Sequence, residues 1–158
     1  MHSFRVAAVS SIAIACAAFA VPASAGEEPL YQPAPDWVGF EPLTQEDLAV
    51  ESPLVRAEKR VRLEDGRVWS YSDAALRLGT PEMLTQMNQL AQVWMPDKGD
   101  LIFHSVQLIR DGKVIDLLAD GNRFEVLRRE QELEKRVLDG RLTATMPLSG
   151  AQVGDVLR

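Results

Sequence analysis

Residues 54–78, LVRAEKRVRLEDGRVWSYSDAALRL, contain the pattern that decides the fold of this 158-residue chain. One face of the first half carries Val55, Ala57, Val61 and Leu63, interrupted by Lys59. The other face carries Arg56, Glu58, Arg60, Arg62 and Glu64. This alternation predicts a strand with one buried face and one solvated face. Asp65-Gly66 then predicts a hairpin turn into a second strand over 67–78, because glycine tolerates positive φ.

Three further Asp-Gly pairs follow, at residues 111–112, 120–121 and 139–140. Apolar or alternating runs lie around these pairs, and they predict strands over 101–110, 114–118 and 142–148. A last apolar run begins at Val153 and reaches Arg158 with no turn or polar tail after it. Since domains usually end in exposed segments, we expect that the chain was cut from a longer protein.

Residues 124–138 leave two alternatives open. Phe124 and Val126 alternate with charged residues, which favours a strand at the start. Glu132 and Arg136 are four residues apart, as in a pair that stabilises a helix, and this supports a helix further on. We therefore expect a strand first and keep both strand and helix open for 129–138.

The segment from Thr80 to Val93 has helical spacing instead. Thr80 suits an N-cap and Pro81 suits the first helical turn. The apolar residues of this segment are Met83, Leu84, Met87, Leu90 and Ala91. They predict one amphipathic helix. With the runs above, the sequence predicts a mainly β domain over 54–158, an antiparallel β-sandwich-like module with this helix packed on it.

Residues 1–25 have the composition of a targeting segment. A basic start, an uncharged middle and the small residues Ala23 and Ala25 at its end predict a cleaved secretory signal peptide. The protein would then be exported, to the periplasm or the extracellular space. A permanent membrane anchor and lipidation at Cys16 are the alternatives.

Residues 26–53 hold five prolines, at positions 29, 33, 35, 42 and 53. Because proline fixes φ and removes a donor, we expect an extended leader with at most one helical turn over Thr44–Leu48. Its aromatic residues, Tyr31, Trp37 and Phe40, either pack on the neighbouring domain or bind a partner.

The composition excludes several function classes. The formal net charge of −6 argues against a nucleic-acid partner. The single cysteine, Cys16, lies in the predicted signal peptide, so the exported chain would have neither a disulfide nor a thiol nucleophile. With two histidines and no CxxC motif, we expect no metal and no cofactor. After signal cleavage we expect no membrane span.

Few residues are candidates for chemistry. His104 could act as a base or ligand, but a partly buried, hydrogen-bonded histidine is the simpler interpretation. No serine lies in a GxSxG elbow, and no catalytic residue is assigned. The candidates for an interaction surface are Trp69, Tyr71, Trp94 and His104, with core packing as the alternative for the three aromatics.

Several stretches together resemble a known family. They are WMP at 94–96, RDGKVID at 110–116, FEVLRRE at 124–130, LDGRLT at 138–143 and VGDV at 153–156. From about Leu54 onward the chain resembles the DUF3857 domain, which precedes a transglutaminase-like domain in exported bacterial proteins. The resemblance implies a β-sandwich module, with a Cys-His-Asp catalytic set in the following domain and none of that set in this chain.

Three functions follow as hypotheses. In the first, the chain is a non-catalytic accessory module that docks on a downstream catalytic domain or helps present a polypeptide or envelope substrate. In the second, it is a stand-alone binding or assembly module of the cell envelope. In the third, it is a complete small hydrolase that uses carboxylates or a serine.

Overall fold

The computed structural model describes residues 26–128 and 140–158. Its strands are β1 (Leu30–Tyr31), β2 (Leu54–Glu64), β3 (Arg67–Arg77), β4 (Gln89–Trp94), β5 (Ile102–Phe103), β6 (Gln107–Arg110), β7 (Lys113–Asp116), β8 (Glu125–Arg128), β9 (Leu142–Pro147) and β10 (Val156–Leu157). Its helices are η1 (Asp36–Val38), α1 (Gln45–Ala49), α2 (Pro81–Gln86) and η2 (Ala119–Gly121). The signal-peptide prediction and the open choice at 129–138 lie outside the described residues.

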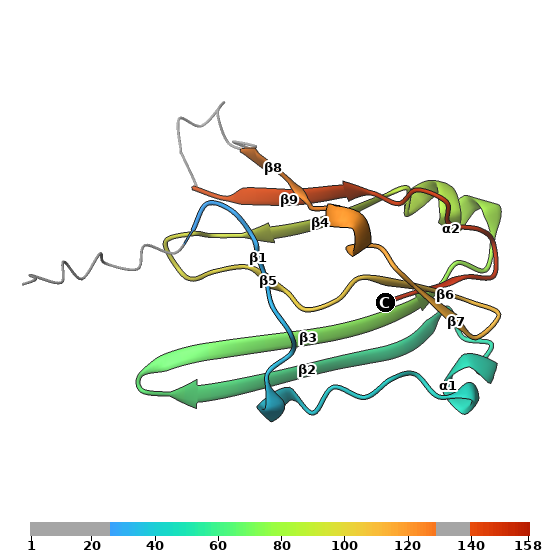
Figure 1. Ribbon diagram of the computed structural model, residues 1–158, viewed down its shortest axis with the longest axis horizontal. Coiled ribbons are helices and arrows are strands. Elements are labelled where there is room, and N and C mark those ends of the chain that lie inside the picture. Colours follow the sequence, from blue (N-terminus) through green and yellow to red (C-terminus); the bar gives the residue numbers. More distant parts are fainter. Residues whose placement is uncertain (1–25, 129–139) are drawn as a thin grey trace, which may run out of the picture.

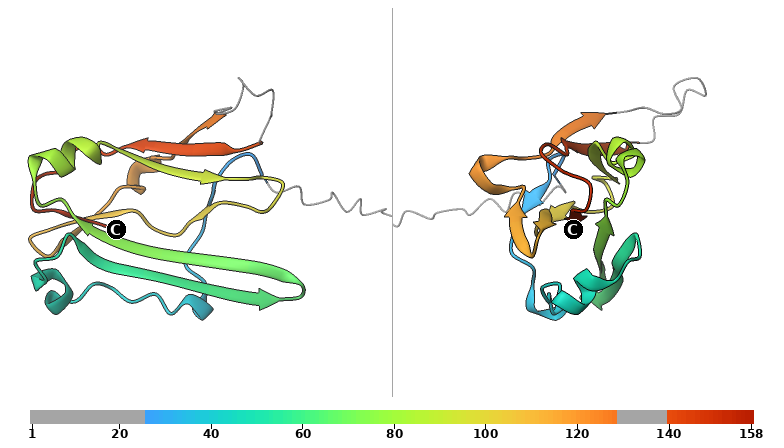
Figure 2. Two further views of the ribbon diagram at one scale, coloured as in Figure 1. Left: turned by 180° about the vertical axis from the view of Figure 1, so that it is seen from behind. Right: turned by 90° about the vertical axis from the view of Figure 1, so that its right-hand side faces the viewer.

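The strands form three sheets. One has five strands in the order β2-β3-β10-β6-β7, one has three in the order β4-β9-β8, and β1 pairs with β5 in parallel. In Figure 1 the three-stranded sheet lies above the long β2–β3 hairpin, and Figure 2 shows the same layers from behind and from the side. The prediction of a mainly β, sandwich-like fold is confirmed.

Two of the Asp-Gly pairs make the predicted hairpin turns. Asp65 and Gly66 join β2 to β3 with φ of 51° and 73°, and Asp111 and Gly112 join β6 to β7 with φ of 50° and 73°. Positive φ at both central residues gives the turn whose twist matches that of the flanking strands.

Two buried clusters fill the space between the sheets. The first contains Trp94, Val106, Phe124, Leu142, Ala144 and Met146. The second contains Leu78, Leu108, Leu148 and Leu157. The alternating run at 142–148 is therefore the strand expected there, and it lies in the core.

The predicted helix over Thr80–Val93 is wrong in its second half. Thr80 caps α2 by accepting a hydrogen bond from the Met83 amide, but the helix ends at Gln86. The next residues form β4, which pairs with β9 from Gln89–Pro147 to Trp94–Leu142. A spacing of four, as between Leu90 and Trp94, fits one helix face and one strand face equally. Pairing with a buried strand therefore decides the structure here.

The expected strand over 101–110 is interrupted. It consists of β5 and β6, separated by residues 104–106. The strand expected at the start of 124–138 is confirmed as β8, which pairs with β9.

The leader follows one side of the domain. Its expected helical turn is α1, where Thr44 and Asp47 form a reciprocal capping box. Leu43 and Leu48 cover the second face of the five-stranded sheet, against a buried cluster of Ala75, Ile109 and Val156. The leader's aromatics contact the domain, as the packing alternative expected.

The prediction that the charged face of β2 is solvated is wrong. The leader crosses this face, where Arg60 donates to the Val38 carbonyl and Arg56 Nη1 donates to the Glu41 carbonyl at 3.0 Å. The apolar face is the open one, with Val61 63% exposed and Leu63 73% exposed. Alternation locates a strand, but it does not say which face another segment covers.

β10 is a two-residue strand at the centre of the five-stranded sheet. Asp155, just before it, accepts bonds from Arg110 Nε at 2.8 Å and Nη2 at 2.7 Å. Arg158, just after it, donates to Asp73 from Nε at 3.0 Å and Nη2 at 2.6 Å. The Arg158 and Asp73 side chains are only 3% and 6% exposed. Two ion pairs therefore fix β10 between its neighbours, β3 and β6.

Within the described ranges, no helix is long and apolar enough to cross a membrane.

Candidate functional site

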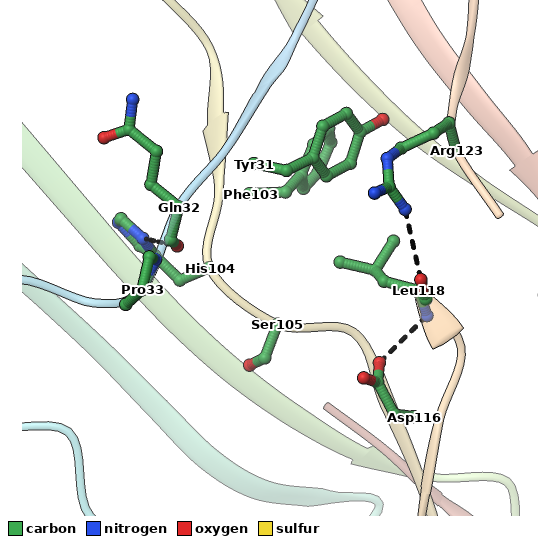
Figure 3. Close-up of a pocket in the computed structure, with 9 residues that line it drawn as sticks. All are labelled: Tyr31, Gln32, Pro33, Phe103, His104, Ser105, Asp116, Leu118 and Arg123. Carbon is green, nitrogen blue, oxygen red and sulfur yellow. Dashed lines mark hydrogen bonds between the residues drawn. The ribbon is translucent and has the colours of Figure 1, made fainter. Parts of the chain in front are cut away.

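A hollow of about 220 Å³ lies where the leader meets β5 and the β7–η2 connection (Figure 3). Its lining residues are Tyr31, Gln32, Pro33, Phe103, His104, Ser105, Asp116, Leu118 and Arg123. The parallel pairing of β1 with β5 brings the first three residues to the others, because Tyr31 lies opposite Phe103 in that ladder. The leader is therefore one wall of the site.

One side of the hollow is aromatic and cationic. The rings of Tyr31 and Phe103 stack at 5.9 Å, and Phe103 stacks on Phe124 at 4.0 Å. The Tyr31 hydroxyl accepts a hydrogen bond from the Phe124 amide at 2.8 Å. The Arg123 guanidinium carbon lies 4.5 Å from the centre of the Tyr31 ring, within the range of a cation–π interaction. This wall offers a flat apolar surface beside a positive charge.

His104 lies on the other side of the hollow. Its Nδ1 is 2.9 Å from the Gln32 carbonyl oxygen. A carbonyl only accepts, so Nδ1 carries the proton, and Nε2 is left as an acceptor in the neutral ring. The ring centre lies 6.0 Å from that of Tyr71, on β3. His104 therefore attaches the leader to the domain.

A serine, a histidine and an aspartate line the hollow, but they are not arranged as in a serine hydrolase. Figure 3 shows the His104 ring turned toward Gln32 and away from Ser105. Asp116 Oδ1 instead accepts from the Leu118 amide at 2.9 Å. Nucleophilic catalysis needs the serine hydroxyl bonded to a base that a third group orients. In this arrangement neither His104 nor Asp116 is positioned to activate the Ser105 hydroxyl.

In the described part of the chain, no group of three His, Cys, Asp or Glu side chains is close enough together to hold a metal ion.

One family profile matches the sequence. It is described as "Domain of Unknown Function with solved-structure structure (DUF3857)", and it matches residues 64–158. The chain belongs to the DUF3857 family. No curated protein and no solved structure compared with the chain matches it. The matched region of the DUF3857 domain runs from the end of β2 through β10 and leaves out the leader, so one wall of the hollow lies outside it.

The DUF3857 domain places the four sequence candidates at different depths. Trp69 is 42% exposed, near the tip of the β2–β3 hairpin, whereas Trp94 is buried in the first core cluster. Tyr71 is buried near His104, and the structure brings only these two together. Burial raises the pKa of Tyr71, and the nearby negative charge of Asp73 raises it further.

The sequence alone does not indicate the aromatic wall of the hollow. In the sequence Tyr31 stands out only as a leader aromatic, and no pattern marks Phe103 or Arg123. Their meeting depends on β1, a two-residue parallel strand too short to carry a sequence pattern. The aromatics of the leader alternate with prolines, and this pattern predicts that they pack against the domain. It does not predict which part of the domain they contact.

Proposed function

We propose that this chain is the non-catalytic accessory module of an exported transglutaminase-like or peptidase-like protein. In this role it docks on a downstream catalytic domain or helps present a polypeptide substrate to it. The catalytic Cys-His-Asp set belongs to that downstream domain. Membership of the DUF3857 family and the motifs at 94–96, 110–116 and 153–156 support the proposal.

The observation that carries the proposal is the engagement of His104. Its Nδ1 bonds to a leader carbonyl, and the nearby Asp116 caps the backbone of Leu118. Both groups hold segments of the domain together, while the aromatic and cationic wall beside them remains a surface on which a chain segment could rest. A structural and binding role accounts for this arrangement better than a chemical one.

The reading frame beyond Arg158 is the first test. A downstream cysteine with histidine and aspartate partners is expected. A stop codon directly after Arg158 would contradict the accessory role. The next experiment adds the purified chain to the separately expressed downstream domain and measures kcat/KM on a polypeptide and on a small amide substrate. The chain is expected to raise the first value and leave the second unchanged, whereas turnover by the chain alone would overturn the proposal.

Export is tested separately. N-terminal sequencing of the protein produced in a bacterial host is expected to begin at Gly26, after removal of residues 1–25. A product that begins at Met1 would contradict cleavage of a signal peptide.

A further inference from the structure

The start of the leader is held against the domain by an acidic side chain. The backbone nitrogen of Gly26 donates to Oδ1 of Asp100 at 2.8 Å. Asp100 lies in the connection between β4 and β5 and directly precedes Leu101, whose carbonyl accepts from the Leu30 amide at 2.8 Å. The contact between Gly26 and Asp100 therefore lies immediately before the pairing of β1 with β5.

The carboxylate of Asp100 is exposed, and its charge is not neutralised. Within the described ranges, no Lys or Arg nitrogen lies within ion-pair distance of it, and the Gly26 amide gives it a single hydrogen bond. The nearby Asp97 differs, because its Oδ2 lies 3.3 Å from Lys98 Nζ. An ionised carboxylate has about four acceptor positions, and one neutral amide fills only one of them. Asp100 can therefore accept a donor that carries more protons and a positive charge.

Removal of residues 1–25 creates such a donor at the same nitrogen. Hydrolysis of the peptide bond between Ala25 and Gly26 consumes one water molecule and leaves a carboxylate on Ala25 and an α-ammonium on Gly26. An α-amino group is mostly protonated at neutral pH. The nitrogen that carries one proton in the uncleaved chain then carries three, and its hydrogen bond to Asp100 becomes an ion pair. Cleavage thus changes the charge of a group that already contacts Asp100.

We propose that Asp100 is the binding site for the α-ammonium group of Gly26 in the processed chain, and that this ion pair holds the leader on the domain. The ligand of the site is the chain's own new N-terminus. The inference rests on the signal-peptide cleavage proposed above and goes beyond it, because it gives the new terminus a binding partner and a structural role.

Binding of the terminus stabilises the wall of the hollow that the leader provides. Leu30, four residues after Gly26, begins β1, and the next residue, Tyr31, stacks on Phe103 at 5.9 Å. The first residues of a domain are poorly ordered unless a contact holds them. An ion pair at Gly26 opposes fraying toward β1, so the processed chain keeps Tyr31 in the hollow for a larger fraction of the time.

The test compares two forms of residues 26–158, one with a free amine at Gly26 and one acetylated at that nitrogen. Acetylation removes the charge and keeps one N–H donor. Amide hydrogen exchange at Leu30 reports the opening of β1, because this amide donates to the Leu101 carbonyl. At low salt we expect acetylation to speed this exchange about threefold, the size of effect typical of an exposed ion pair. At about 1 M salt the difference is expected to shrink. Equal exchange in the two forms at low salt would overturn the proposal.

Asp100→Asn and Asp97→Asn form a matched pair of variants. Both remove one exposed negative charge from the connection between β4 and β5, but only Asp100 contacts Gly26. In Asp100→Asn, acetylation is expected to leave exchange at Leu30 unchanged. In Asp97→Asn, acetylation is expected to speed it about threefold, as in the parent chain. An undiminished effect of acetylation in Asp100→Asn would assign the ammonium to another carboxylate, such as that of Glu28, and would overturn the proposal.

Failure of the cleavage and failure of the site give different results. N-terminal sequencing of the exported protein finds another first residue if the proposed cleavage position is wrong. The exchange measurements use chains prepared to begin at Gly26, so they test Asp100 independently of processing in the host. Sequencing that finds Gly26 first, together with no effect of acetylation, would overturn only this inference. The comparison of the two forms of the parent chain needs no substitution, so it also decides the matter if Asp100→Asn fails to fold.

Discussion

The centre and the edge of the five-stranded sheet are stabilised in opposite ways. β2 and β3 are eleven residues each and paired along their length, yet Leu63 and Val68 remain mostly exposed. β10 is two residues long, yet both of its side chains are buried and an ion pair lies at each end. The comparison shows that backbone pairing and burial are separate properties. In the β2–β3 hairpin local sequence specifies the pairing, whereas contacts with distant segments decide which side chains are buried.

The largest expected effect comes from breaking the pair at the end of β10. Asp73→Ala leaves the Arg158 guanidinium buried without its carboxylate, and we expect the free energy of unfolding to fall by roughly 3–5 kcal/mol. Urea denaturation measures this change. The double variant Asp73→Leu/Arg158→Met removes both charges and is expected to recover most of the loss. A single variant as stable as the parent chain would contradict the importance of this pair.

Leucine truncation compares the two regions directly. Leu157→Ala empties part of a buried cluster and is expected to cost about 2–5 kcal/mol of unfolding free energy. Leu63→Ala removes a side chain that is 73% exposed and is expected to change stability by about 0.5 kcal/mol or less. Thermal and urea unfolding of the two variants measure the contrast. Similar losses at both positions would contradict the difference drawn between centre and edge.

Acid is expected to weaken the centre through Asp155. Its hydrogen bonds from Arg110 lower the pKa of this carboxyl below the ordinary value of 3.8. The unfolded chain therefore takes up this proton first as the pH falls. The stability that Asp155 contributes is fully present above the unfolded value and is lost as the pH falls through the folded pKa. Unfolding free energies between pH 6 and pH 2 should depend less on pH in Asp155→Asn. An identical pH dependence would contradict this role.

The smallest expected effect concerns the start of α2. Thr80→Ala removes the hydroxyl that accepts the Met83 amide and is expected to cost about 1 kcal/mol. Thr85→Ala is a matched control within the same helix, because the Thr85 hydroxyl bonds only to the Pro81 carbonyl one turn earlier. Urea unfolding of both variants measures the difference. A larger loss from Thr85→Ala would contradict the capping role.

Sequence reasoning succeeded where local chemistry decides the structure. Asp65-Gly66 and Asp111-Gly112 form hairpin turns because their backbone angles suit those residues, and Thr80 and Thr44 begin helices because their hydroxyls accept amides. It failed where a distant segment decides. Residues 89–94 became β4 through pairing with β9, and the leader covered the charged face of β2. The aromatic wall of the candidate site depends on β1 meeting β5, which no local pattern encodes.

The most direct test of the account is residue-resolved hydrogen exchange on the chain with no ligand added. Along β3 the account predicts an alternating pattern. Tyr71, whose amide points toward β2, exchanges slowly, while Ser70 and Ser72 on either side exchange rapidly. Leu157 in β10 is expected to exchange as slowly as the most protected amides of the domain. Uniformly slow exchange through Ser70, Tyr71 and Ser72 would contradict pairing of this described stretch with β2 alone, and rapid exchange at Leu157 would contradict a firmly held centre.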